Sequence, residues 1–121
     1  MNLTVKQSLT VGKIKTVAAL IGIDPAWATA VAMVESSLGE RQLSPTGCKG
    51  VFQMSMIAMK DLHFLMQEKD DDFADIACGM LFLRLLLKRW KTIEKATAHF
   101  CDPNDRDFYI DKVKEYMKVF A

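Results

Sequence analysis

DPAWATAVAMVESSLG, residues Asp24 to Gly39, establishes the helical character of this chain. Asp24 is a good cap for the free amides of a helix start, and Pro25 suits the first helical position, where its missing N–H costs nothing. Gly39 is a residue type that ends helices. Apolar side chains follow Pro25 at helical spacing: Trp27, Ala30, Val31, Val34 and Leu38. The pattern predicts a helix that buries this stripe in a core.

Glu35 lies beside the apolar stripe, four residues after Val31 and in the last turn of the predicted helix. The negative end of the helix dipole disfavours a charged carboxylate there. Partial burial acts in the same direction, so both effects predict a raised pKa for Glu35. A glutamate whose pKa is raised toward the working pH can act as a general acid. The alternative is an exposed glutamate at a helix end.

The rest of the chain also has helical rather than strand periodicity, which predicts a compact all-α fold with a single domain over residues 1–121. Further helices are expected at Val11–Ile21, Ser55–Gln67, Phe73–Lys91 and Asp105–Phe120. The third of these is apolar nearly all round, which is typical of a central helix in a bundle. The acidic run Asp70–Asp72 is interpreted as its solvated first turn. A short segment up to Cys101 separates the last two helices.

Composition excludes several classes of protein. The formal net charge is +1, so the overall charge gives no nucleic-acid footprint. The three cysteines, Cys48, Cys78 and Cys101, are odd in number and widely spaced, which does not suit a disulfide framework. His63 and His99 are the only histidines, and no metal or other cofactor is expected. Hydrophobic residues make up 50% of the chain, enough for a core without such supports.

The residues after Glu35 carry a motif. Glu35-Ser36 is followed by Ser44-Pro45-Thr46-Gly47 and then by Gly50-Val51-Phe52-Gln53. The Ser44–Gly47 stretch fits a type I turn, and we expect this Gly/Pro loop to fold back over the glutamate. The spacing resembles the signature of the soluble lytic transglycosylase domain, which is related in fold to goose-type lysozyme. That signature is Glu-Ser followed by Ser-Pro-x-Gly-Ala-x-Gly-Leu-Met-Gln.

Two later blocks extend the resemblance. Ala98–Pro103 looks like the family's Ala-Tyr-Asn-Ala-Gly-Pro, with His99-Phe100 in place of Tyr-Asn, as in some phage members. Tyr109–Val113 is similar to the family's Tyr-Val-Lys-x-Val. The resemblance runs from about Ile14 to Tyr116, nearly the whole chain.

The resemblance implies a lysozyme-like helical fold and an enzyme that cleaves peptidoglycan between N-acetylmuramic acid and N-acetylglucosamine. In this family a single glutamate, here Glu35, protonates the β-1,4 glycosidic oxygen. It then accepts the proton of the C6 hydroxyl, which closes a 1,6-anhydro ring. The substrate's acetamido group stabilises the cation, so the second carboxylate of most glycosidases is not needed. Glu40, the other acid nearby, is interpreted as a surface residue.

The resemblance also implies contacts with glycan strands. Candidate substrate-binding residues are Ser44, Phe52, Gln53, His99, Phe100 and Tyr109. By analogy Ser44 bonds the acetamido group, Gln53 lines the sugar cleft, and Tyr109 brings its hydroxyl to the glutamate. The aromatic residues at 52 and 100 are candidates for stacking on sugars, and His99 for a substrate contact. Each has a plainer alternative as a turn former, a surface amide, a satisfied histidine or a core aromatic residue.

Three alternatives remain open. A goose-type muramidase would hydrolyse the same bond with water. A glycan-binding structural component of a virion or secretion machine would bind without turnover. Cys48-Lys49-Gly50-Val51-Phe52-Gln53 also resembles the cysteine block of cell-wall amidases, but that fold needs a histidine on a sheet, and strand signals are scarce here.

No secretory signal is visible in the first residues, and the longest apolar stretch, Met80–Leu87, is interrupted by Arg84 and is too short to span a bilayer. We therefore expect no membrane insertion, and we expect a monomer. It would be made in the cytoplasm and act on the periplasmic cell wall by another route, as a phage lysin or virion-associated protein does, or the chain is a piece of a larger protein.

Overall fold

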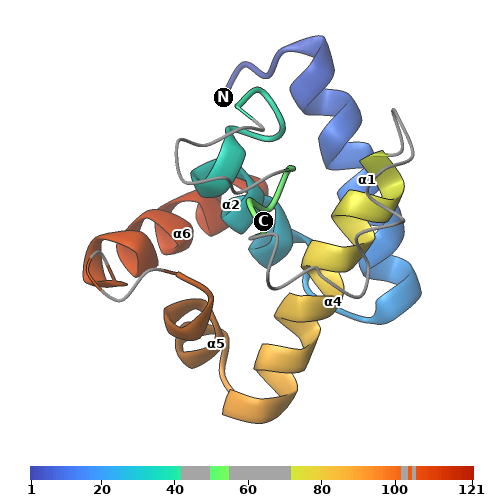
Figure 1. Ribbon diagram of the computed structural model, residues 1–121. Coiled ribbons are helices and arrows are strands. Elements are labelled where there is room, and N and C mark those ends of the chain that lie inside the picture. The colour runs from blue at the N-terminus through green and yellow to red at the C-terminus, as the bar shows by residue number, and fades with distance from the viewer. Residues whose placement is uncertain (42–49, 55–71, 102–103, 105) are drawn as a thin grey trace.

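The computed structural model describes residues 1–41, 50–54, 72–101, 104 and 106–121. All regular elements of this described part are helices: α1 (Val5–Ile21), α2 (Pro25–Ser36), α4 (Asp72–Trp90), α5 (Ile93–Phe100) and α6 (Arg106–Phe120). Figure 1 shows α2 between α1 and α4 on one side and α5 and α6 on the other. Helix α2 packs on α1 and α6, and α4 packs on α1 and α5. The prediction of a compact all-α fold is confirmed for these residues.

Helix α1 begins six residues before the predicted start at Val11. Thr4 and Gln7 form a capping box, in which each side chain accepts the backbone N–H of the other residue. This reciprocal pair satisfies two amides that a helix start would otherwise leave without partners. The helix ends at Gly22, as predicted, and this glycine adopts the left-handed conformation with φ 73°.

Helix α2 has the predicted start, because the Asp24 side chain accepts the N–H of Ala26 and Pro25 takes the first helical position. Its end is more abrupt than a single glycine stop. Ser37, Leu38 and Gly39 all have positive φ, at 54°, 55° and 93°. Left-handed conformations cost about 1–2 kcal/mol for residues other than glycine, so two of these three positions are strained. The chain therefore turns sharply just behind Glu35.

The turn behind Glu35 is held by the first turn of α1. Gln7 Nε2 donates to the Ser37 carbonyl oxygen over 3.1 Å. Thr4 Oγ1 donates to Glu40 Oε1 over 2.6 Å. We call Thr4 and Gln7 the N-terminal brace. Strained backbone persists only where the surrounding structure fixes it, and the brace supplies part of that fixation.

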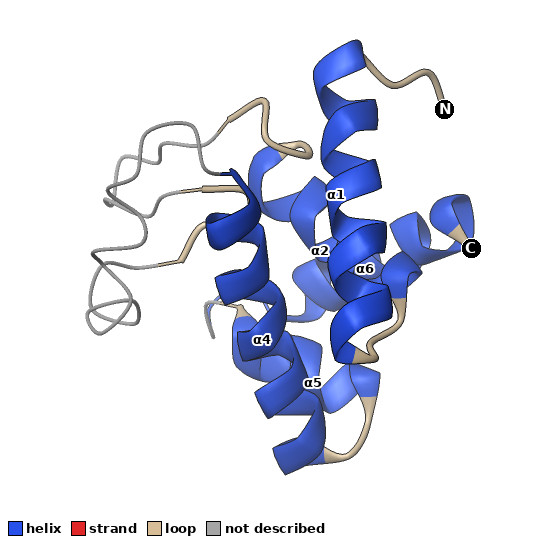
Figure 2. Cartoon of the chain, turned by 90° about the vertical axis from the view of Figure 1, so that its right-hand side faces the viewer, coloured by secondary structure: helices blue, strands red, loops and turns tan. Residues whose placement is uncertain are grey.

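Helices α4 and α6 match the predicted segments to within one residue at each end. Helix α4 lies alongside α1 (Figure 2). It buries Ile76, Met80 and Leu83, whereas Phe73, Leu81 and Leu85 on its other sides are exposed. The sequence predicted a central helix enclosed on all sides. The structure instead buries α4 along one side only. Helix α5 was not predicted; Thr92 caps its start by accepting the N–H of Lys95.

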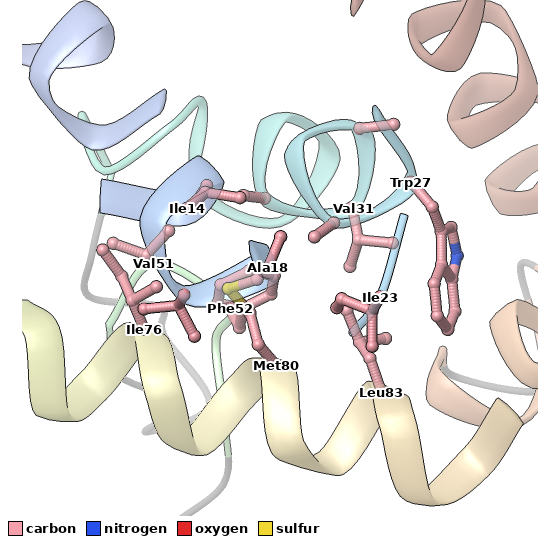
Figure 3. Close-up of a cluster of buried hydrophobic side chains, with 14 of the residues drawn as sticks. Ile14, Ala18, Ile23, Trp27, Val31, Val51, Phe52, Ile76, Met80 and Leu83 are labelled. Atoms are coloured by element: carbon pink, nitrogen blue, oxygen red, sulfur yellow. The ribbon is translucent and has the colours of Figure 1, made fainter. Parts of the chain in front are cut away.

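The core joins α1, α2, α4 and the short segment at residues 50–54 (Figure 3). Side chains from all four parts are almost fully buried there: Ile14, Ala18, Trp27, Val31, Val51, Phe52, Ile76 and Met80. The stripe predicted on α2 is confirmed, with Val34 only half-buried. Burial of the larger of these side chains stabilises the fold by about 1.5–3 kcal/mol each.

Several predicted features lie outside the described residues: the helix at Ser55–Gln67, the turn at Ser44–Gly47, Cys48, His63 and the acids Asp70 and Asp71. Among the helices that are described, none combines the length and apolar character needed to cross a membrane.

Candidate functional site

Glu35 lies in the last turn of α2, where that helix packs against α6. Tyr109 Oη, from the first turn of α6, donates a hydrogen bond to Glu35 Oε1 over 2.5 Å. Burial raises the pKa of Glu35 above its usual range, and the hydrogen bond from Tyr109 opposes this rise without cancelling it. The raised pKa predicted from the sequence is confirmed in direction, and burial is its main cause.

Tyr109 has a buried ring and a hydroxyl that reaches the glutamate. Both sequence interpretations of this residue, core aromatic and partner of Glu35, therefore hold for its geometry. The pKa of Tyr109 is raised well above its ordinary value, first by burial and then by the negative charge of Glu35. The phenol consequently stays protonated and remains a hydrogen-bond donor at any ordinary working pH.

The segment Gly50–Gln53 is held beside the end of α2. Ser36, the neighbour of Glu35, donates through Oγ to the Val51 carbonyl oxygen over 2.6 Å. The same Oγ accepts the N–H of Gly39 over 2.9 Å. On the other side of the residue, in the preceding peptide group, the Val51 N–H donates to Asp75 Oδ2 of α4 over 2.8 Å. Ser36 is therefore structural, as interpreted from the sequence, and it links the acid-bearing turn to the motif segment.

Gln53 follows this segment with a left-handed backbone, φ 51°. Its side-chain amide folds back, and Nε2 donates to the Gly50 carbonyl oxygen over 2.8 Å. The same nitrogen lies 3.4 Å from the Arg41 carbonyl oxygen, a weak contact at best. The amide thus shapes its own loop, and the substrate contact implied by the resemblance stays a prediction.

Phe52 requires a correction. Its side chain is 0% exposed and belongs to the core. It packs directly over Gly79 of α4, where an added Cβ would come within 2.6 Å of the Phe52 Cβ and ring atoms. No face of this ring is open to a sugar, so we assign Phe52 to the core and not to substrate binding.

The aromatic residues at the end of α5 have partners on α4. The half-buried Phe100 ring lies 5.7 Å from Phe82, at an interplanar angle of 51°. The exposed His99 stacks on Trp90, with centroids 3.7 Å apart and planes 6° from parallel. These contacts fix both side chains, whereas their predicted contacts with substrate are not tested by them.

Three residues near the site were missed by sequence reasoning. Cys101 has a raised pKa, mainly because of burial and to a small extent because of the Glu35 charge, while a hydrogen bond with Arg106 opposes the rise. Arg106 also donates through Nε to the Ala98 carbonyl oxygen and so joins the end of α5 to α6.

Asp75 was overlooked because it follows an acidic run. Its place one helical turn before Gly79 is the signal that marks it as an inward-facing position.

Of the remaining residues considered from the sequence, only Glu40 can be placed. Ser44 lies outside the described residues. Glu40 is exposed and bonded to Thr4, in line with its interpretation as a surface residue. Within the described ranges, histidine, cysteine and acidic side chains do not cluster in threes as a metal ion would require.

Comparisons of the chain with protein-family models, with curated proteins and with solved structures found no match.

Proposed function

We propose that this chain is a peptidoglycan lytic transglycosylase. It cleaves the β-1,4 bond between N-acetylmuramic acid and N-acetylglucosamine and leaves a 1,6-anhydromuramic end. The observation that carries the proposal is the pair of Glu35 and Tyr109. A partly buried glutamate with a raised pKa and a direct phenol donor has the properties of a proton-transfer group.

In the proposed reaction Glu35 begins protonated and gives its proton to the glycosidic oxygen as the bond to the muramic carbon breaks. The resulting carboxylate then takes the proton of the C6 hydroxyl while the C6 oxygen bonds to that carbon. Tyr109 donates to Glu35 Oε1. A donor to the charged form stabilises the carboxylate between the two steps. The raised pKa keeps Glu35 protonated before the first step and makes its carboxylate a better base in the second, whereas the Tyr109 hydrogen bond stabilises the carboxylate and so favours proton release in the first step.

The position of the motif segment supports the same proposal. Ser36 bonds the backbone of Val51, so the segment that carries Gln53 is attached to the residue next to Glu35. In the proposed site this attachment fixes the position of the glycan-facing loop relative to the Glu35 carboxyl. Glu40 is exposed and tied to α1, and so is not offered as a second catalytic carboxylate.

Digestion of purified peptidoglycan, followed by mass spectrometry of the released muropeptides, tests the proposal. Anhydro ends are expected. Reducing ends would instead indicate hydrolysis of the goose-lysozyme type, and cut peptides would indicate the cysteine chemistry of Cys48. Binding of the protein to the glycan without release of any fragment would indicate a binding module.

Glu35→Gln is the matched variant, because it keeps the shape of the side chain and an acceptor for Tyr109 but cannot hold the proton. Loss of a general acid lowers the rate by about 10²–10⁴-fold. Glu115→Gln, an exposed residue on α6, serves as the control and retains activity. Full activity of folded Glu35→Gln protein would refute the assignment.

A further inference from the structure

The backbone of Val51 is bonded by side chains from two different helices. Its N–H donates to Asp75 Oδ2 over 2.8 Å, and its carbonyl oxygen accepts from Ser36 Oγ over 2.6 Å. Ser36 belongs to α2 and Asp75 to α4. The backbone of Val51 therefore connects α2, which carries Glu35, to α4.

The Asp75 carboxyl is built into this junction. The residue is 6% exposed. Gly50 lies so close that an added Cβ would come within 2.0 Å of Asp75 Oδ1 and 2.5 Å of Oδ2. Gly50 also has φ 84°, a conformation that favours glycine. Two features therefore favour glycine at position 50: the positive φ of its backbone and the Asp75 carboxyl that lies against it.

Helix α4 supports the motif segment along one face. Asp75 meets Gly50 and Val51, and Gly79, one turn further on, meets Phe52. Gln53 follows at once and carries a left-handed backbone that costs about 1–2 kcal/mol. Such a conformation persists only where neighbouring contacts determine it. The contacts of Gly50, Val51 and Phe52 with α4 and Ser36 contribute to this, together with the bonds that Gln53 itself makes to the Gly50 carbonyl oxygen.

We propose that Asp75 is a positioning residue of the site. Its buried carboxyl fixes the Val51 peptide, and through Val51 and Ser36 it sets the placement of the Gln53 loop relative to Glu35. The effect of Asp75 on the rate of reaction rests on the proposed function. The hydrogen bonds that Val51 makes to Asp75 and Ser36 are independent of that function.

The kinetic test compares Asp75→Ala, Asp75→Asn and the control Asp111→Ala, an exposed residue on α6, in peptidoglycan digestion. A displaced site loses about 100-fold in rate. Folded Asp75→Ala protein is therefore expected to lose about 100-fold in kcat with a much smaller change in KM. Asp75→Asn keeps an oxygen acceptor for the Val51 N–H and recovers most of this loss. Wild-type kcat in folded Asp75→Ala, or equal losses in the two variants, would overturn the role.

Amide hydrogen exchange tests the junction independently of activity, and its measurement on the native protein does not depend on the folding of any variant. The Val51 amide, although outside the helices, is expected to exchange slowly, and to exchange faster in Asp75→Asn, since a neutral acceptor bonds more weakly than a carboxylate. A Val51 amide that exchanges as in an unstructured peptide would refute the positioning role.

The two proposals fail in distinguishable ways. If wild type and Asp111→Ala both release no muropeptides, the proposed function is wrong, and the kinetic role of Asp75 falls with it. If both are active and Asp75→Ala equals them, the proposed function stands and the positioning role alone is wrong.

Discussion

Glu35 is governed by two opposing effects. Burial raises its pKa, and the hydrogen bond from Tyr109 lowers it, with burial the larger effect. The position at the negative end of α2 acts in the same direction as burial. The pKa of Glu35 is therefore raised above its ordinary value, and the Tyr109 hydrogen bond limits that rise.

The first prediction concerns the stability of Glu35→Gln as a function of pH. Because the pKa of Glu35 is raised in the folded protein, the folded state holds this proton more tightly than the unfolded chain does. The stabilisation that protonated Glu35 contributes is present in full below pH 4.5, the ordinary pKa of a glutamate. It is lost as the pH rises through the raised pKa of the folded protein. Glu35→Gln removes the loss, so its melting temperature is expected to exceed that of wild type at neutral pH.

Thermal melts below pH 4.5 and at neutral pH check this prediction. The advantage of Glu35→Gln should disappear at the lower pH, where both side chains are neutral. Glu115→Gln, on the exposed face of α6, is the control for loss of a glutamate charge in general. A Glu35→Gln protein that is less stable than wild type at neutral pH would show that the carboxylate is favoured by its surroundings.

Tyr109→Phe gives the second prediction. The change removes the one effect on Glu35 that lowers its pKa. The alkaline limb of the kcat/KM profile, which reports the essential acid of the free enzyme, should therefore move to higher pH. Loss of the hydrogen bond should also cost about 1–3 kcal/mol of stability. Tyr116→Phe, on the same helix and paired with Phe120 rather than with Glu35, should leave the limb in place. A limb that moves to lower pH would contradict the assignment.

At the scale of elements, α4 is the support on which the motif segment lies. Gly79 allows Phe52 to approach the helix axis closely, since any larger side chain there would overlap the ring. The buried face of α4 thus has a shape matched to the Gly50–Phe52 backbone, and the helix does more than fill the core.

The third prediction compares two helical glycines. Gly79→Ala brings a Cβ within 2.6 Å of Phe52 and should destabilise the protein by about 1–3 kcal/mol, less any gain in helix propensity. Gly12→Ala in α1 is the matched control, because nothing lies within 4 Å of its added Cβ. It should stabilise the protein by about 0.5–1 kcal/mol. Urea denaturation measures both. A Gly79→Ala protein that gains as much as Gly12→Ala would contradict the close packing of Phe52.

The sequence predicted α2, α4 and α6 well, but it missed the start of α1 and the short helix α5. The stripe from Trp27 to Leu38 and the cap at Asp24 located α2. The start of α1 was missed because its first two turns have little amphipathic pattern, although the Thr4-x-x-Gln7 capping box marks it. Helix α5 was missed because its 8 residues are too few for periodicity to be decisive.

Local sequence pattern predicted the candidate site only at Glu35, whereas the contact of Tyr109 with it was expected from the family resemblance alone. Glu35 combines a helix end with an apolar face, and both can be read from the sequence. The partnership of Tyr109 with Glu35 spans 74 residues and depends on how α6 packs against α2, which no local pattern contains. Asp75 was hidden for a related reason, since an acid after an acidic run resembles a surface residue until the fold places it against Gly50.

At the scale of the whole molecule, α2 and α5 are joined by a buried side-chain contact. Trp27 Nε1 donates to Thr97 Oγ1 over 2.9 Å, and Thr97 Oγ1 in turn donates to the Ile93 carbonyl oxygen over 2.7 Å. The helix that carries Glu35 is thereby connected to the short helix that leads to Cys101 and α6.

Trp27→Phe gives the fourth prediction. The change removes a buried donor and leaves Thr97 Oγ1 without it, which should cost about 1–3 kcal/mol. Far-UV circular dichroism during urea denaturation measures the loss without depending on tryptophan emission. Trp90→Phe, at a partly exposed position, should cost only about 0.5 kcal/mol or less. Equal losses in the two variants would show that the buried contact adds nothing.

The N-terminal brace has a consequence for the reading of variants. Gln7 precedes Ser37 by 30 residues in the sequence, yet together with Thr4 it holds the backbone reversal that follows Glu35. Substitution of either residue therefore loosens the backbone that follows Glu35. A change of behaviour in such a variant reports on the reversal and not on the Glu35 carboxyl itself.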